Sequence, residues 1–185
     1  MSRTIDNIVT EGLSGKLYQL VFKQWFGRTI VAKRPRKFTT VTSNQLTIRE
    51  NFKKAATYAK AAITDAALKL AYKAKAKPGQ TAYNMAFADF FNLPEIGDID
   101  SSGYNGDVGT KLMAQVTDDF KVVSVKVIIQ KSGGSLIEEG NASLLPDGIH
   151  WEYKSTVQNG LVAGTKVSFV ATDLPGHSIT KFKTL

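Results

Sequence analysis

Residues 122–129 read VVSVKVII, and their pattern indicates the fold class of the C-terminal half of the chain. Valine or isoleucine occupies every second position from Val123 to Ile129, and this alternation is typical of a half-buried β-strand. The same pattern recurs in three other segments, Leu112–Val116, Trp151–Tyr153 and Val167–Ala171. Glycine, proline and aspartate turn signals separate the segments. The spacing predicts an all-β sandwich of about six or seven short strands over residues 98–185.

The preceding half of the chain has a helical period instead. Between residues 44 and 77 there are 10 alanines and no glycine or proline, a composition that favours helix. Thr42 is followed three residues later by Gln45, which forms a capping box, and Asp65 is a second N-cap signal. The pattern predicts three helices, at residues 43–62, 65–76 and 82–92, the last one capped by Thr81.

Helical spacing also predicts which side chains of the second helix are buried. Ala66, Leu70 and Ala74 recur every four residues and form the expected apolar stripe. Lys69, Lys73 and Lys77 form a separate stripe, which we expect to face solvent.

Before the helices, residues 16–34 are predicted to form a β-hairpin. Two apolar runs flank a segment in which Gly27 can adopt the positive φ of a tight turn. Residues 1–15 are polar and without a clear period, which predicts an arm. The predicted fold class is therefore α+β, with a basic hairpin-plus-helical domain at 1–95 and a β-sandwich domain at 98–185.

Charge is unevenly distributed between these two parts. The 185-residue chain has a formal net charge of +8. Residues 1–97 contain 16 Lys and Arg against 6 Asp and Glu, whereas residues 98–185 contain 8 against 10. This asymmetry indicates an acidic partner for the N-terminal half.

A short basic segment is the best candidate for that contact. Cationic side chains can neutralise phosphates and aromatic rings can stack on bases, so the combination suits an acidic partner or a nucleic acid. An acidic protein surface fits equally well, and the lysines of the helices are also compatible with a solvated face. The predicted site residues are Trp25, Arg28, Lys33, Arg34, Arg36 and Lys37.

Other chemistries have little support in the sequence. There is no cysteine, which excludes disulfides and thiolate catalysis, and no nucleophile or phosphate-loop motif occurs. The two histidines, His150 and His177, are too few for a typical zinc site. No signal-peptide core or apolar run of membrane-spanning length is present. We therefore expect a non-enzymatic protein without cofactor or metal, in the cytoplasm or in a virion.

A calcium loop is the one metal site that the sequence leaves open. Asp98, Asp100 and Ser102 match the first ligand positions of such a loop, and Asp107 offers a further oxygen. The final position, where a bidentate glutamate is needed, is Gly109. The alternative is a polar linker between the two halves.

Two resemblances add to this interpretation. The segments Val122–Val127, Leu136–Ala142, Trp151–Tyr153 and Val170–Gly176 resemble bacterial immunoglobulin-like modules. In such modules the Trp-x-Tyr strand fills the core, which implies an immunoglobulin-like sandwich but no particular function.

The N-terminal half is similar to uncharacterised proteins from Bacteroidetes genomes and their phages or mobile elements. The segments that carry this resemblance are Leu13–Leu17, Val21–Lys23, Thr29–Lys33, Gln45–Tyr58, Asp65–Tyr72 and Gly79–Asn84. It implies a phage or mobile-element context. The resulting expectation is a structural or assembly protein that forms oligomers or assemblies with other protein subunits, and the alternative is a nucleic-acid-binding protein.

Overall fold

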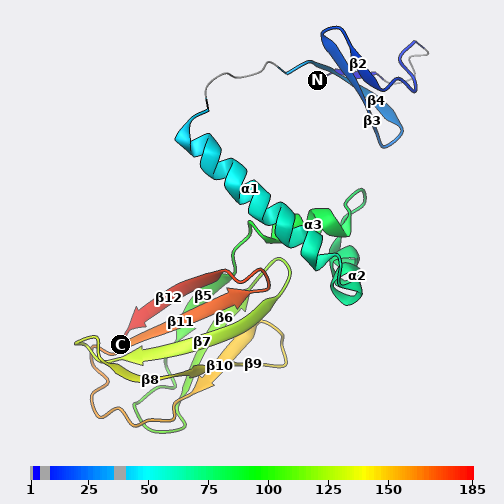
Figure 1. The fold of residues 1–185 in the computed structure, drawn as a ribbon. Helices are drawn as coiled ribbons and strands as arrows, with labels where there is room; N and C mark the ends of the chain where they lie inside the picture. The colour runs from blue at the N-terminus through cyan, green and yellow to red at the C-terminus, as the bar shows by residue number, and fades with distance from the viewer. Residues whose placement is uncertain (1, 5–8, 36–40) are drawn as a thin grey trace. The chain divides into compact units, whose positions relative to one another are not determined.

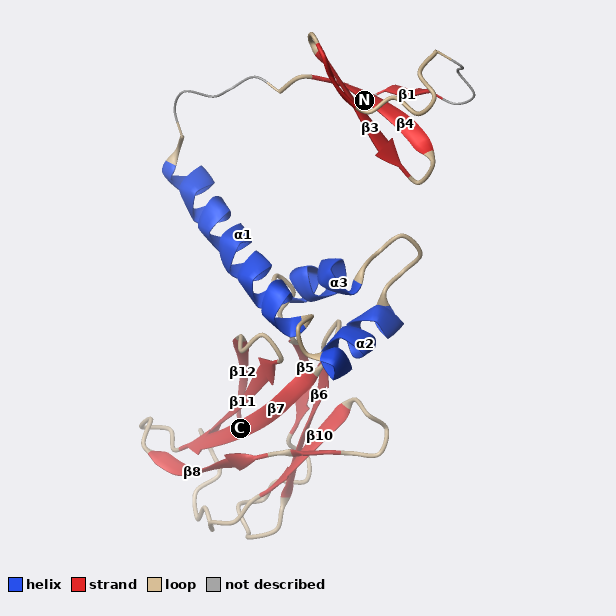
Figure 2. Ribbon diagram, turned by 45° about the vertical axis from the view of Figure 1, so that its right-hand side comes forward, coloured by secondary structure: helices blue, strands red, loops and turns tan. Residues whose placement is uncertain are grey.

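The computed structural model describes residues 2–4, 9–35 and 41–185. Within them the chain forms three helices and three four-stranded antiparallel sheets, so the fold is mixed α+β as predicted (Figures 1 and 2). Contacts divide the chain into two compact units, residues 1–52 and 53–185. The division falls inside the first helix, whereas residues 93–98, the predicted boundary, mark the change from helix to strand.

The first unit contains a small sheet with the strand order β1-β4-β3-β2. Its strands are β1 (Ser2–Thr4), β2 (Gly15–Leu17), β3 (Leu20–Trp25) and β4 (Arg28–Lys33). The predicted hairpin corresponds to β3 and β4 only. The apolar run around Leu17 contains a two-residue turn at Tyr18 and Gln19, which the sequence did not reveal because Tyr18 adopts a left-handed φ of 49° without being glycine, asparagine or aspartate.

The helices follow their predicted start signals. They are α1 (Ser43–Ala62), α2 (Ala66–Lys75) and α3 (Ala82–Asp89). The three N-caps are confirmed: Thr42 and Gln45 exchange reciprocal hydrogen bonds, Asp65 accepts from two backbone N–H groups, and Thr81 accepts from one. Helix α3 ends three residues earlier than predicted, since the N–H groups of Phe91 and Asn92 both donate to the carbonyl of Ala88 in a tightened last turn.

The predicted apolar stripe of α2 was wrong. Leu70 is 67% exposed and Ala66 and Ala74 are also exposed, whereas Tyr72 is completely buried. The inward side of the helix instead runs through Tyr72, with the half-buried Leu68 and the half-buried C-cap residue Ala76 four positions before and after it. Tyr72 is buried in place of the predicted alanine and leucine stripe because its hydroxyl donates a hydrogen bond to the buried carboxylate of Asp89.

Residues 95–185 form two facing sheets with the orders β5-β6-β10-β9 and β12-β11-β7-β8. The strands are β5 (Glu95–Asp100), β6 (Lys111–Thr117), β7 (Val122–Gln130), β8 (Leu136–Asn141), β9 (Ser143–Leu144), β10 (His150–Lys154), β11 (Lys166–Asp173) and β12 (Ser178–Thr184). Alternate residues of each sheet meet in one core, which includes Leu112, Val127, Trp151 and Phe169. The alternation in the sequence therefore located this core correctly.

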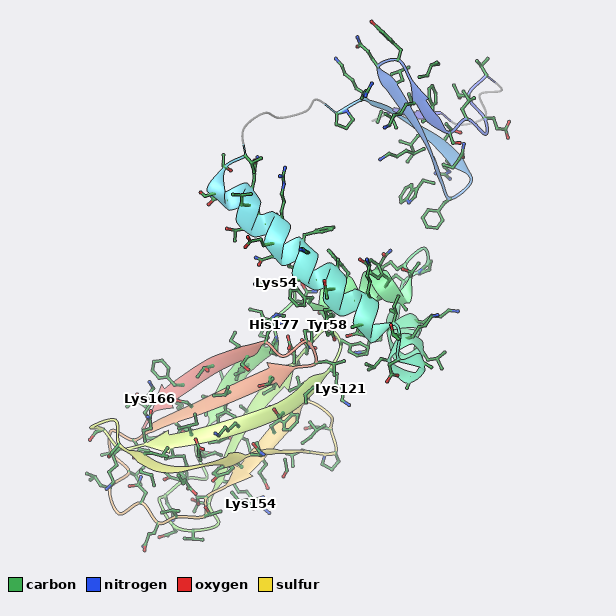
Figure 3. All side chains as sticks on the ribbon, in the orientation of Figure 1. Lys54, Tyr58, Lys121, Lys154, Lys166 and His177 are labelled. Atoms are coloured by element: carbon green, nitrogen blue, oxygen red, sulfur yellow. The ribbon has the colours of Figure 1, made fainter. Side chains whose placement is uncertain are left out.

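The helices of the second unit pack on the sandwich through the turn between β6 and β7. The ring of Phe120 in this turn stacks on Tyr72 of α2, with 3.9 Å between ring centroids and 18° between planes. Lys75 donates to the carbonyls of Asp119 and Phe120. The β11–β12 turn adds an edge-to-face contact between His177 and Phe90, near the place where Figure 3 labels Tyr58 and His177.

Candidate functional site

One face of the small sheet collects cationic and aromatic side chains. Lys16 pairs with Val21, and Trp25 pairs with Arg28 across the β3–β4 hairpin. Because side chains alternate along a strand, Lys23 lies on the same face as Val21 and Trp25. Lys16, Lys23, Trp25 and Arg28, all exposed, are called the cationic face below.

The opposite face of this sheet is partly covered by the chain itself. Phe22 and Thr29 are buried there. Gln24 on the same face donates from Nε2 to the carbonyl of Leu13 at 2.9 Å and to Oγ1 of Thr29 at 2.8 Å. The two faces therefore differ: Phe22 and Thr29 are buried on one, whereas the charged side chains and Trp25 on the other are exposed.

The tip of the β3–β4 hairpin presents two aromatic rings. Trp25 is 56% exposed and Phe26 is 64% exposed, and their ring centroids are 5.1 Å apart in an edge-to-face arrangement. Phe26 and Gly27 have φ values of 49° and 70°, the left-handed pair that a type I′ turn requires. This conformation is unusual for an aromatic residue, and it holds the Phe26 ring outward at the tip.

The structure separates the predicted site residues. Trp25 and Arg28 lie on the cationic face, but Lys33 pairs with Leu20 and therefore lies on the other face. Arg34 follows β4, and its backbone N–H donates to the carbonyl of Gln19. Tyr18, Gln19, Lys33, Arg34 and Pro35 line a shallow hollow of about 420 Å³.

Two further predicted residues, Arg36 and Lys37, lie outside the described residues. Sequence reasoning missed Lys16 and Lys23, since they are not part of the basic run. The pairing register of the strands shows that both lysines lie on the cationic face. For Lys16 this register depends on the turn at Tyr18, which the sequence did not predict.

The cations of the two halves of the chain differ in how they are neutralised. Every ion pair found among the described residues joins two residues between Asp98 and Lys181, as in Lys111 with Glu152 at 2.8 Å and Lys126 with Glu139 at 2.9 Å. Within the described part of residues 9–97, no lysine or arginine is paired with a carboxylate. The described cations of the small sheet are therefore not neutralised by a carboxylate in the described part of the chain.

A buried carboxylate lies where the helices meet the sandwich. Asp89 of α3 is 3% exposed and accepts a 2.6 Å hydrogen bond from the hydroxyl of Tyr72, which in turn is 2.8 Å from the hydroxyl of Tyr58. Burial raises the pKa of Asp89 to about 6, against the lowering effect of the Tyr72 hydrogen bond, and the charges of Asp118, Asp173 and Asp119 raise it further. Burial also raises the pKa of Tyr72, which keeps its hydroxyl a donor.

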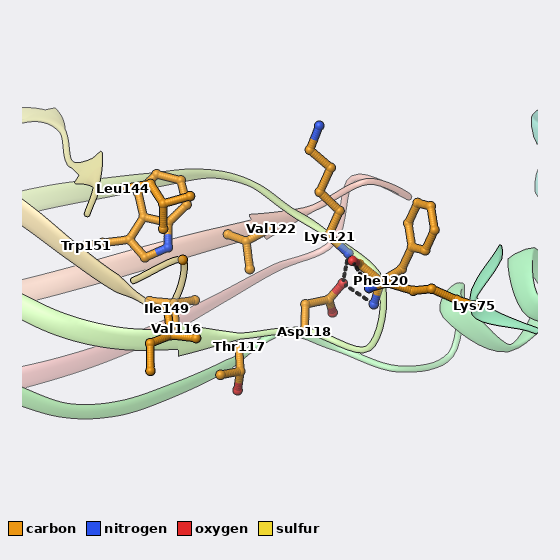
Figure 4. Close-up of a pocket in the computed structure, with 11 residues that line it drawn as sticks. Lys75, Val116, Thr117, Asp118, Phe120, Lys121, Val122, Leu144, Ile149 and Trp151 are labelled. Atoms are coloured by element: carbon orange, nitrogen blue, oxygen red, sulfur yellow. Dashed lines mark hydrogen bonds between the residues drawn. The ribbon is translucent and has the colours of Figure 1, made fainter. Parts of the chain in front are cut away.

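A second hollow, of about 310 Å³, opens between the two sheets near this turn (Figure 4). Its walls are mainly apolar and include Val122, Leu144, Ile149 and Trp151. Asp118 is at its edge, with Oδ2 accepting from the backbone N–H groups of Phe120 and Lys121. These two hydrogen bonds stabilise the β6–β7 turn.

The carboxylates of the candidate calcium loop are engaged separately. Asp98 lies on β5 and pairs with Lys181, Asp100 accepts from the backbone N–H of Ser102, and Asp107 accepts from the side chain of Asn105. No group of three or more metal-ligating side chains occurs among the residues that the structure describes.

Each histidine is paired locally. His150 lies 2.6 Å from Asp147, and His177 lies 3.1 Å from Asp173. Backbone N–H groups of His150 and Ile149, together with the His150 ring, lower the pKa of Asp147 to about 2. None of the helices in the described ranges has the length and apolar character needed to cross a membrane.

Comparisons with known proteins give little further information. No protein-family model matches the chain, and no curated protein matches it. A crystal structure of an engineered protein is similar at 16% sequence identity and a TM-score of 0.34, covering 60% of this chain and 30% of that one. The chain thus matches less than a third of that protein's length, and at this level neither its fold nor its function transfers.

Proposed function

We propose that this chain is a non-catalytic structural or assembly protein whose basic N-terminal part contacts an acidic partner. The observation that carries the proposal is the cationic face, where Lys16, Lys23 and Arg28 lie on the same side of the sheet as an exposed tryptophan. None of these three cations is paired with a carboxylate among the residues that the structure describes. Unpaired cations on an ordered surface attract anionic partners and set the orientation of docking.

The second unit fits the role of a scaffold in such an assembly. Its sheets have the orders β5-β6-β10-β9 and β12-β11-β7-β8, which correspond to the A-B-E-D and G-F-C arrangement of immunoglobulin-like sandwiches with one added edge strand. Trp151 is 8% exposed and lies in the core with Tyr153, which supports this part of the proposal. We therefore propose that residues 98–185 are an immunoglobulin-like module. The phage or mobile-element context is also part of the proposal, and it depends on the resemblance of the N-terminal half.

Nucleic-acid binding is the second candidate function. The exposed Trp25 and Phe26 favour it, since nucleobases stack on aromatic rings.

Native mass measurement of the purified protein, alone and with an anionic polymer, tests the main proposal. We expect defined oligomers, or complexes with the polymer that dissociate as salt is raised. A protein that stays monomeric and binds no anionic polymer or acidic protein at low salt would contradict it.

A further inference from the structure

We infer that the ligand of the cationic face is single-stranded nucleic acid, with a base stacked on Trp25 and phosphates held by Lys16, Lys23 and Arg28. This inference rests on the proposed function and names the acidic partner. The pairing register of β2, β3 and β4 places three cations and one aromatic ring on a single face of the sheet.

The aromatic side chains distinguish a nucleic acid from other anions. An acidic protein surface or a sulfated polysaccharide satisfies the lysines and the arginine, but offers few flat rings to Trp25 and Phe26. Nucleobases supply such rings, and base–aromatic stacking is tolerant of sequence. The rings of Trp25 and Phe26 already contact each other edge to face at the hairpin tip without any ligand, so part of the stacking surface is formed in the chain itself.

The shape of the site favours a single strand over a duplex. In a duplex the bases are stacked on each other, and an aromatic ring reaches a base face only where the stack is opened. The major groove, about 12 Å wide, admits a helix or a two-stranded ribbon. The cationic face belongs to a four-stranded sheet, whose outer strands are about 14 Å apart at about 4.8 Å per strand. A sheet of this width offers an open platform on which a single strand can lie.

Tryptophan fluorescence and anisotropy with a labelled oligo(dT) test the inference in the full chain. The protein has two tryptophans, and Trp151 is buried in the sandwich core, so quenching by the oligonucleotide reports Trp25. We expect quenching on binding, and a loss of affinity of at least about fivefold in Trp25→Ala. Phe182→Ala, which removes an exposed ring of the sandwich, is the matched control and should bind like the wild type.

The salt dependence of the affinity for oligo(dT) tests the contribution of the charged residues. In the triple variant K16A/K23A/R28A the slope of log affinity against log salt should fall by about 2, since each phosphate contact on a single strand contributes about 0.7. K69A/K73A/K77A removes the same charge from the exposed face of α2 and the turn after it, and should leave the slope unchanged.

Four outcomes would overturn the inference. Equal affinity of the wild type and Trp25→Ala for oligo(dT) would show that no base stacks on Trp25. Tighter binding to a duplex than to the single strand would identify a groove contact. Binding to heparin or polyglutamate but not to oligo(dT) would reject nucleic acid and leave the proposed function standing. A protein that stays monomeric and binds none of heparin, polyglutamate and oligo(dT) would reject both the inference and the proposed function.

Discussion

Replacing Asp89 with asparagine should remove a pH-dependent loss of stability from the junction between the helices and the sandwich. Asp89 is buried, and its pKa is about 6 in the folded protein against an ordinary value of 3.8. A group whose pKa is raised by folding stabilises the folded state below its unfolded pKa, and this stabilisation is lost as pH rises through the folded value. The contribution of Asp89 to the stability of the wild type should therefore fall between pH 4 and pH 7, an interval that includes the folded pKa of about 6.

The size of the effect follows from the same two values. At about 1.4 kcal/mol for each tenfold change in proton affinity, the raised pKa corresponds to about 3 kcal/mol. Asparagine cannot ionise, and its carbonyl oxygen can still accept the hydrogen bond of the Tyr72 hydroxyl. The stability difference between D89N and the wild type should rise by up to about 3 kcal/mol from pH 4 to pH 7, with the variant the more stable protein at pH 7.

Urea unfolding at a series of pH values between 4 and 8 measures this difference. Glu95→Gln is the control because it removes one carboxylate charge at an exposed position of β5, and its curve should stay nearly parallel to that of the wild type. If the D89N and wild-type curves are parallel, or if the wild type gains stability from pH 4 to pH 7 relative to D89N, the assignment of Asp89 as a buried carboxyl with a raised pKa is wrong.

Three further substitutions, one of them with a control, test a buried carboxylate, a close backbone contact and a helix N-cap. Glu138→Ala removes a buried carboxylate that accepts four hydrogen bonds, and should cost about 3 kcal/mol or more in urea unfolding, whereas Glu139→Ala, which breaks only a surface ion pair, should cost less than about 1 kcal/mol. Gly106→Ala should lower the melting temperature because the added Cβ would lie 2.3 Å from the carbonyl oxygen of Asn159 at a φ of +91°; an unchanged melting temperature would refute that contact. Asp65→Ala should lose about 1 kcal/mol through its N-cap, and no loss in thermal unfolding would contradict the capping geometry.

The parts of the fold that depend on period and on local caps were predictable from the sequence. The alternation from Val123 to Ile129 located a core strand, although Val123 itself is exposed at the strand end, and Asp65 and Thr81 marked helix starts. These signals depend on neighbours within a few residues, so no tertiary contact is needed to read them.

The parts that depend on distant contacts were not predictable. The burial of Tyr72 depends on Asp89 and Phe120, which follow it by 17 and 48 positions in the sequence. Similarly, the candidate site was only partly found from the basic run. Lys16 joins Arg28 on one face because the chain turns at Tyr18, where the residue type gives no turn signal.

The most direct test of the proposed acidic contact compares two variants of equal net charge on an anionic column. K16A/K23A/R28A and K69A/K73A/K77A each remove three positive charges, the first from the cationic face and the second from α2 and the turn that follows it. We expect heparin to release the first variant at clearly lower salt than the wild type, and the second variant at nearly the same salt as the wild type. Equal reductions in both variants would mean that only net charge matters, and would contradict a defined binding face on the small sheet.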